Sequence, residues 1–256
     1  MITKQQLSEF KTTGYLRIRK VLSCESINEM FQTVVEAYKS YSGSLVDSDT
    51  AFTSWEDEKF SSALIKLRRQ DQHRFSAIYD SMLASYALQK LCFNNRLGEY
   101  SAALLNARAT DLCYRGAMLR MDVPGDTRNV YGWHQDSSYT NYNSNGLHAI
   151  TAWCPLVNVT RHNGTLQVCE GSHVEPTALP TGTTLGKGYS LQNLVKSEVI
   201  GKYRVVDVEG DAGDVIFSYS SLIHRSGENS SDKVRFTAIV RYHQMLSQDF
   251  HLFPKD

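Results

Sequence analysis

The chain has 256 residues, of which 41% are hydrophobic and 21% are charged, a composition typical of a globular protein with a sizeable core. Its 27 lysines and arginines balance its 27 aspartates and glutamates, so net charge favours binding neither to nucleic acid nor to a membrane surface. No CxxC pair, no apolar signal segment and no apolar run of about 20 residues is present. We therefore expect a cytoplasmic protein without a disulfide framework.

The first part of the chain, mainly residues 1–110, predicts helices. Residues 3–40 favour helix, interrupted by the alternating stretch GYLRIRKVL at 14–22, which is typical of a short strand. The polar segment 42–60 is rich in glycine and serine and predicts a surface loop. From about residue 61 to residue 105 the apolar residues return to helical spacing.

The second part of the chain predicts strands that are bounded by Gly, Pro, Asn and Asp. These strands are expected at 112–125, 146–159, 164–169, 203–210, 213–220 and 234–243. Residues 175–200 predict a long loop beside the mouth of a barrel. The pattern favours a single α+β domain over residues 1–256. We expect a double-stranded β-helix (jelly-roll or cupin-like) core, mainly at 111–245, flanked by N-terminal and central helices.

The stretch GWHQDSS at 132–138 carries a histidine and an aspartate that are separated by one residue. In extended backbone His134 and Asp136 project to the same side, where they could hold one divalent ion. A second histidine from a distant strand would complete a 2-His-1-carboxylate triad, which is typical of non-haem Fe(II) oxygenases. His224 is the best candidate because it directly follows the apolar stretch GDVIFSYSSLI. The alternative for each histidine is a structural or surface residue.

Arg235 lies eleven residues after His224, on the predicted strand VRFTAIVRY. A buried arginine needs an anionic partner, and its planar guanidinium pairs well with a carboxylate. A dicarboxylate co-substrate would supply that partner, and Ser226 could donate a hydroxyl to the same group. The alternative is that Arg235 bridges to an aspartate of the core.

Three motifs together extend these observations over nearly the whole chain. They are WHQD, then AWCPLVNVTRHNGTLQVCEGSH, then HRSGENSSDKVRF. With the N-terminal LSEFKTTGYLRIRKVLSCESI, they resemble the phytanoyl-CoA dioxygenase family of Fe(II)/2-oxoglutarate-dependent oxygenases. One departure is CEGSH in place of the family's PGSH, which affects a turn and no ligand.

The resemblance implies ligands at the positions that match the family's motifs. They are His134, Asp136 and His224 for iron, and Arg235, Ser226, Trp153 and Met118 for 2-oxoglutarate. Arg120 lies two residues beyond Met118 on the same strand face, so it could reach the co-substrate or the substrate. The aspartate ligand argues for hydroxylation or another oxidation rather than halogenation, because related halogenases carry a small residue at that position.

The resemblance also implies the reaction. Iron, 2-oxoglutarate and O2 would hydroxylate an unactivated C–H bond of a small polar metabolite, with release of succinate and CO2 and with ascorbate as an expected stimulant. The other hypothesis is a non-oxygenase, cupin-like metal-binding module, which would have no need of the Arg235 and Ser226 pair. We expect a small-molecule substrate, neither nucleic acid nor membrane as a partner, and a monomer or a homodimer.

The substrate-contacting residues are predicted from their closeness to the iron site. Tyr131, Gln135 and Tyr139 form a polar and aromatic rim, which suits a small polar or sugar-like substrate and equally an ordinary hydrogen-bonded loop. Arg241 shares a strand face with Arg235 and could meet an acidic substrate group; the alternative is a structural ion pair. No extended basic patch is evident, so an acyl-CoA is not the first choice of substrate.

Overall fold

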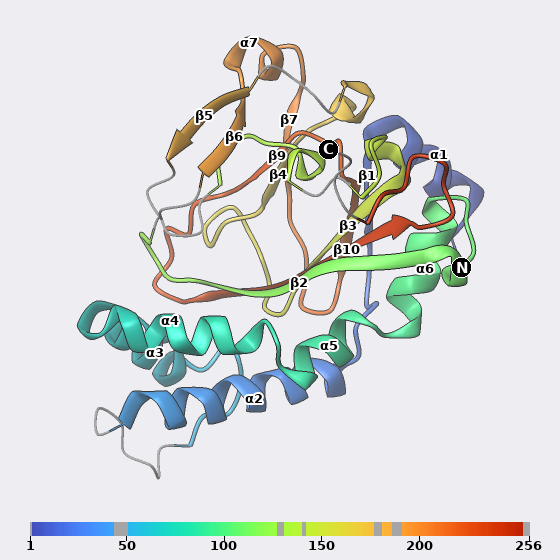
Figure 1. Ribbon diagram of the computed structural model, residues 1–256. Helices are drawn as coiled ribbons and strands as arrows, with labels where there is room; N and C mark the ends of the chain where they lie inside the picture. The colour runs from blue at the N-terminus through green and yellow to red at the C-terminus, as the bar shows by residue number, and fades with distance from the viewer. Residues whose placement is uncertain are drawn as a thin grey trace.

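Helices from the first part of the chain lie against one face of a five-stranded antiparallel sheet (Figure 1). The computed structural model describes residues 2–43, 51–126, 131–139, 142–176, 181–185 and 191–252. The helices before the sheet are α1 (Lys4–Thr13), α2 (Cys24–Ser42), α3 (Glu58–Gln70), α4 (Gln72–Met82), α5 (Tyr86–Cys92) and α6 (Asn95–Leu104). None of these described helices combines the length and the apolar character that crossing a bilayer requires.

Local sequence signals explain where the first helix begins and ends. Thr3 accepts a hydrogen bond from the Gln6 backbone, and the Gln6 side chain accepts one from the Thr3 backbone, which makes a capping box. Gly14 ends α1 with a φ of 87°, a conformation that glycine adopts without strain. The chain then turns directly into strand β1 (Tyr15–Ile18).

The strands form two main antiparallel sheets and a separate pair. The five-stranded sheet has the order β1, β8 (Val215–Tyr219), β3 (Ala149–Pro155), β10 (Arg235–Gln244) and β2 (Leu112–Asp122). The three-stranded sheet has the order β7 (Val205–Val208), β4 (Leu166–Cys169) and β9 (His224–Ser226). Strands β5 (Thr181–Leu185) and β6 (Leu191–Val195) pair with each other, and the short helix α7 (Ser197–Ile200) follows them.

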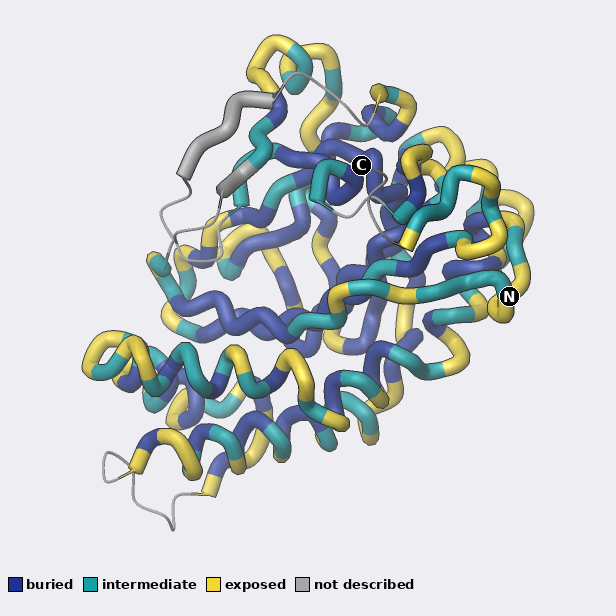
Figure 2. The backbone as a smooth tube through the Cα atoms, in the orientation of Figure 1, coloured by how far each residue is buried: buried dark blue, intermediate teal, exposed yellow. Residues whose placement is uncertain are grey.

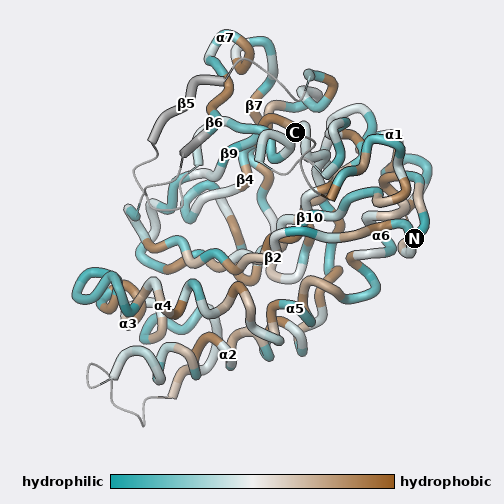
Figure 3. Tube along the Cα trace, viewed as in Figure 1, coloured by the Kyte–Doolittle hydropathy of each residue, from teal (hydrophilic) through white to brown (hydrophobic). Residues whose placement is uncertain are grey.

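The two faces of β10 have different roles. Phe236 packs toward the helices, with its ring 4.4 Å from Trp55 and 5.9 Å from Phe60 between centroids. Successive residues of a strand point to opposite faces, so Arg235 and Arg241 point away from those helices. Strands β3 and β8 are buried throughout and β10 is buried over most of its length, whereas β2 at the edge of the sheet is partly exposed (Figure 2). Figure 3 shows hydrophobic and hydrophilic residues alternating along the helices beside the sheet. The sheet therefore has an apolar helix-covered face and a second face that carries polar side chains.

The structure confirms the α+β prediction with antiparallel sheets and corrects three details. Within residues 42–60, Phe52 and Trp55 are buried and α3 begins at Glu58, so this segment is not simply a surface loop. Within residues 175–200, the described part contains β5, β6 and α7 rather than a loop alone. Strand β9 was not predicted, because three residues are too few to show an alternating pattern.

Candidate active site

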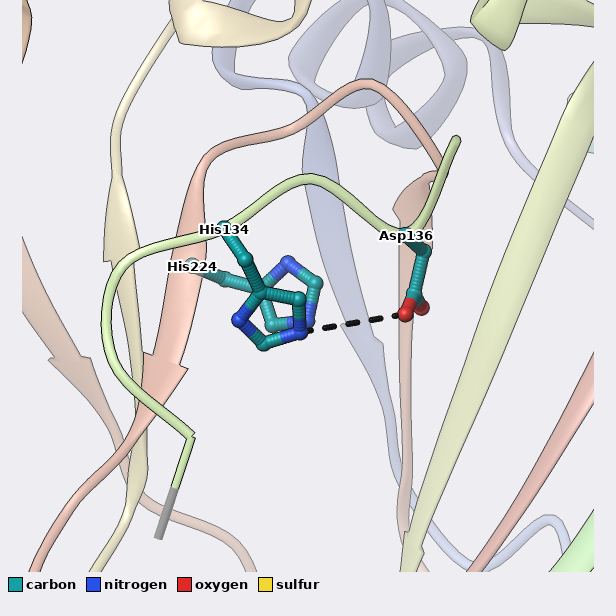
Figure 4. Close-up of side chains that lie close together, drawn as sticks. All are labelled: His134, Asp136 and His224. Carbon is teal, nitrogen blue, oxygen red and sulfur yellow. Dashed lines mark ion pairs between the residues drawn. The ribbon is translucent and has the colours of Figure 1, made fainter. Parts of the chain in front are cut away.

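His134, Asp136 and His224 converge in the structure, as their spacing and context predicted (Figure 4). All three are buried, and their potential ligand atoms lie within 4.8 Å of one another. His134 and His224 are joined by two backbone hydrogen bonds of 3.0 and 2.9 Å. Gln135 is extended, with φ −112° and ψ 133°, which directs its two neighbours to the same side. Across the described ranges, no other group of three histidine, cysteine or acidic residues comes together in this way.

Backbone carbonyls fix the tautomers of both histidines. Nδ1 of His134 lies 2.7 Å from the carbonyl of Gly132, and Nδ1 of His224 lies 3.0 Å from that of Leu222. A carbonyl only accepts hydrogen bonds, so each Nδ1 carries a proton and each Nε2 is the nitrogen that is left to bind a metal. Burial, and then the nearby His224, lowers the pKa of His134 to about 3, which keeps its imidazole neutral at pH 7. His134 Nε2 lies 3.9 Å from Asp136 Oδ1 (Figure 4).

The third member, Asp136, is held through both carboxylate oxygens. Thr151 donates a hydrogen bond of 2.6 Å to Oδ2, and Arg241 Nη2 lies 2.8 Å from Oδ1. Burial raises the pKa of Asp136, but the Arg241 charge and the neighbouring histidines outweigh it and hold that pKa well below its usual range. Two imidazole nitrogens and one carboxylate thus face a common point, a donor set that suits a divalent metal such as iron. Arg241 therefore forms an ion pair, which was the alternative to its predicted contact with an acidic substrate group.

The three side chains line a cavity of about 490 Å³. Most of the residues predicted around the site also line it: Met118, Arg120, Tyr131, Tyr139, Trp153, Ser226 and Arg241. Thr151 and Arg115 line it as well, although the sequence did not point to them. Thr151 could have been found from Trp153, because the two residues share one face of β3.

Gln135 is an exception, and its assignment as a substrate-contacting residue was wrong. Its side chain is fully buried and its Nε2 donates a hydrogen bond of 2.6 Å to the carbonyl of Ser221. It does not line the cavity. Because His134 and Asp136 both point inward, the residue between them must point the other way.

Two arginines share one aspartate beside the cavity. Arg120 Nη2 lies 3.0 Å from Asp122 Oδ1, and Arg235 Nη2 lies 2.6 Å from Asp122 Oδ2. Arg120 also donates a hydrogen bond of 2.7 Å to Ser226 Oγ. Burial raises the pKa of Asp122, but the two guanidiniums outweigh it and lower that pKa. These two arginines and Asp122 therefore carry one more positive than negative charge.

Only one of the two arginines lines the cavity, and it is Arg120. Arg235 is 2% exposed and donates to the carbonyls of Gly164 and Gly227 as well as to Asp122. Arg235 thus bridges to a core aspartate, which was the alternative prediction for this residue. Asp122 could have been found from the sequence, since it shares a strand face with Arg120 two residues away.

Comparison with known proteins is consistent with this geometry. A family model described as phytanoyl-CoA dioxygenase (PhyH) matches residues 10–237. L-Proline trans-4-hydroxylase from Streptomyces griseoviridis is 27% identical over 139 residues, which cover 48% of this chain and 51% of the hydroxylase. The aligned region thus spans about half the length of that enzyme.

Solved structures resemble the fold over nearly all of the chain. The epimerase SnoN, in complex with Fe3+, alpha ketoglutarate and nogalamycin RO, has a TM-score of 0.63 and 18% identity, covering 94% of this chain and 83% of SnoN. EctD from S. alaskensis, with 2-oxoglutarate and 5-hydroxyectoine, has a TM-score of 0.62 and 20% identity, covering 100% of this chain and 82% of EctD. At these identities the likeness concerns the fold alone.

Proposed function

The chain belongs to the phytanoyl-CoA dioxygenase family, and we propose that it is a non-haem Fe(II)/2-oxoglutarate-dependent dioxygenase. Its reaction is the hydroxylation of an unactivated C–H bond of a small polar molecule. The observation that carries this proposal is the pairing of a His134, Asp136 and His224 donor set with the Arg120 and Ser226 pair in one cavity. A purely structural metal site has no need of a carboxylate-binding pair beside it.

His134, Asp136 and His224 would hold the iron through two Nε2 atoms and a carboxylate oxygen. Three protein ligands leave positions open for a co-substrate and O2. When bound there, iron couples the oxidation of 2-oxoglutarate by O2, which yields succinate and CO2, to the oxidation of a substrate C–H bond. The carbonyl contacts to each Nδ1, and the two contacts to Asp136, keep the donors aimed at the ion.

Ser226 and Arg120 would receive the distal carboxylate of 2-oxoglutarate, between walls formed by Trp153 and Met118. In this proposal Arg120 contacts the carboxylate, and Arg235 acts by holding Asp122 in place. The set has a surplus positive charge, and an anion would balance it. The competing prediction, which the family resemblance implies, is that Arg235 contacts the carboxylate directly.

The two main sheets are, in the same proposal, the halves of a double-stranded β-helix within one domain. Support comes from a single buried cluster that includes Phe10 of α1, Phe31 of α2, Val168 of β4 and Phe236 of β10. The cavity is also lined from both sheets, by Met118 of β2 and Leu166 of β4 among others.

Cavity size bears on the substrate. Pockets for small ligands range over roughly 300–1,000 Å³, and the volume of about 490 Å³ must hold both the co-substrate and the substrate. A compact molecule fits this limit better than an acyl-CoA. L-Proline is the first compound to test, because one relative is named as its trans-4-hydroxylase.

Succinate release from 2-oxoglutarate tests the proposal. The wild-type protein, with Fe(II), ascorbate and air, should form succinate in an iron-dependent way, and His134→Ala should not. His162→Ala, at an exposed histidine outside the site, should behave as wild type. No iron-dependent succinate with a broad panel of small molecules, together with no binding of 2-oxoglutarate, would favour the cupin-like alternative.

A further inference from the structure

Strand β2 contains a bulge that reorients one arginine toward the cavity. In its pairing with β10, Met118 lies opposite Ile239 and Arg115 lies opposite Arg241. The chain advances three residues on β2 over the length of two residues on β10, so β2 holds one extra residue there. In a regular strand Arg115 and Met118, three residues apart, would point to opposite faces. Gly116 has a φ of 67°, and with the extra residue here both side chains line the same cavity.

Arg115 has a defined environment in the cavity wall. Its guanidinium lies over the ring of Tyr142, 4.7 Å from the ring centroid, a contact that orients the planar group. It makes no ion pair with any carboxylate of the described residues. A glycine at position 116 also leaves space for Arg241, because a Cβ there would lie 3.3 Å from Arg241 Nη1. Arg115 is therefore a positioned, half-buried cation at the site.

The surrounding charge makes this end of the cavity positive. Arg241 lies across from Arg115 in the sheet and already pairs with Asp136. The Asp136 carboxylate would also ligate the metal, so it cannot neutralise both guanidiniums. Burial, and after it the charges of Arg241 and Arg115, lowers the pKa of the buried His243 to about 4. Both arginines thus contribute to a field that favours an anion.

On the basis of the proposed function, we propose that Arg115 binds a carboxylate of the substrate, so that the substrate is a small carboxylic acid such as a free amino acid. Arg115 and Arg120 are five residues apart on β2, or roughly 15 Å along the strand. The cavity would then have two carboxylate-binding ends, one for the co-substrate at Arg120 and one for the substrate at Arg115. The metal-binding group lines the same cavity.

Calorimetric titration of the protein loaded with Fe(II) and 2-oxoglutarate, without O2, tests this inference. The probes are free L-amino acids, L-proline included, each paired with its primary carboxamide, which lacks the carboxylate charge. At least one acid should bind the wild-type protein roughly tenfold or more tightly than its amide, because hydrogen bonds to a charged group are strong. Arg115→Gln should remove that preference, Arg115→Lys should retain part of it, and Arg108→Gln, at a well-exposed arginine, should leave it unchanged.

Equal binding of acids and amides by the wild-type protein would overturn the inference, whatever the variants do. Unchanged acid affinity in Arg115→Gln, or no acid binding at all, would overturn it as well. Titration of 2-oxoglutarate alone into the Fe(II)-loaded protein separates the two proposals. If 2-oxoglutarate does not bind, the proposed function fails; if it binds and the acid preference is missing, only the role of Arg115 fails.

Discussion

Thr151 of strand β3 donates a 2.6 Å hydrogen bond to Asp136, in the segment that also carries the candidate metal ligand His134. Thr151→Val removes this hydroxyl and keeps the shape of the side chain. We expect Fe(II) affinity to fall roughly tenfold to a hundredfold, since loss of a contact to a metal ligand typically costs this much. Calorimetric titration with Fe(II) measures the change. Thr160→Val, at an exposed threonine, is the control, and equal affinities in the two variants would contradict the role given to Thr151.

The shared Asp122 leads to a prediction that separates Arg120 from Arg235. Arg120→Lys should raise the KM for 2-oxoglutarate about tenfold or more, because lysine cannot bind both Ser226 and Asp122 as the guanidinium does. Arg235→Lys should raise this KM less and lower the Tm more, because its contacts are to Asp122 and to backbone carbonyls. If Arg235→Lys has the larger effect on KM, Arg235 is the direct anchor, as the family resemblance implies.

Gly164 lies directly against the guanidinium of Arg235, in the HNG motif of the sequence. A Cβ at this position would collide with Arg235 Nη1 and would lie 2.6 Å from the carbonyl oxygen of Gly227. Gly164→Ala should therefore lower the Tm by roughly 5 °C or more in thermal unfolding. Gly125→Ala is the matched control, because Gly125 also has a positive φ but no atom within 4 Å of the added Cβ. An equal loss of Tm in both variants would show that φ alone, and not contact with Arg235, explains the glycine.

Burial of His243 predicts a pH dependence of stability for the metal-free protein. The pKa of His243 is lowered from 6.5 to about 4, so the unfolded chain binds a proton between these values and the folded chain does not. The stability that the folded protein has with a neutral His243 is fully present above pH 6.5 and is lost as the pH falls toward 4. From pH 7 to pH 5 it amounts to about 2 kcal/mol of unfolding free energy. His134, with its pKa lowered to about 3, acts in the same direction.

Urea unfolding at pH 7 and pH 5 measures this dependence. His243→Phe should make the fall in unfolding free energy smaller by about the amount that one histidine contributes. His162→Ala, at an exposed histidine, should leave the fall unchanged. An unaltered pH dependence in His243→Phe would mean that His243 does not bind a proton on unfolding in this range.

The elements with strong local signals could be predicted from the sequence. Examples are the stretches bounded by Gly, Pro, Asn and Asp that became β2, β3 and β10. The convergence of the three candidate metal ligands was also predictable, because an extended Gln135 places His134 and Asp136 on one side and His224 stands at the end of an apolar strand.

Other features depend on long-range contacts that local patterns do not carry. Strand β9 has only three residues. It forms because His134 on one side and β4 on the other supply its backbone hydrogen bonds. Trp55 is buried because Phe236 lies against it. The residues around Trp55 in the sequence are polar, so they predicted a surface loop instead. Arg115 faces the cavity only through the bulge at Gly116, since regular alternation places it on the opposite face.

Equilibrium binding of Fe(II), measured under anaerobic conditions for the wild-type protein and its variants, tests the central claim most directly. We predict one Fe(II) per chain in the wild-type protein, with affinity lost in His134→Ala, Asp136→Ala and His224→Ala and kept in His162→Ala. The iron-loaded wild type should then bind one 2-oxoglutarate. Fe(II) binding that survives in all three ligand variants, or iron-loaded protein that does not bind 2-oxoglutarate, would contradict the account.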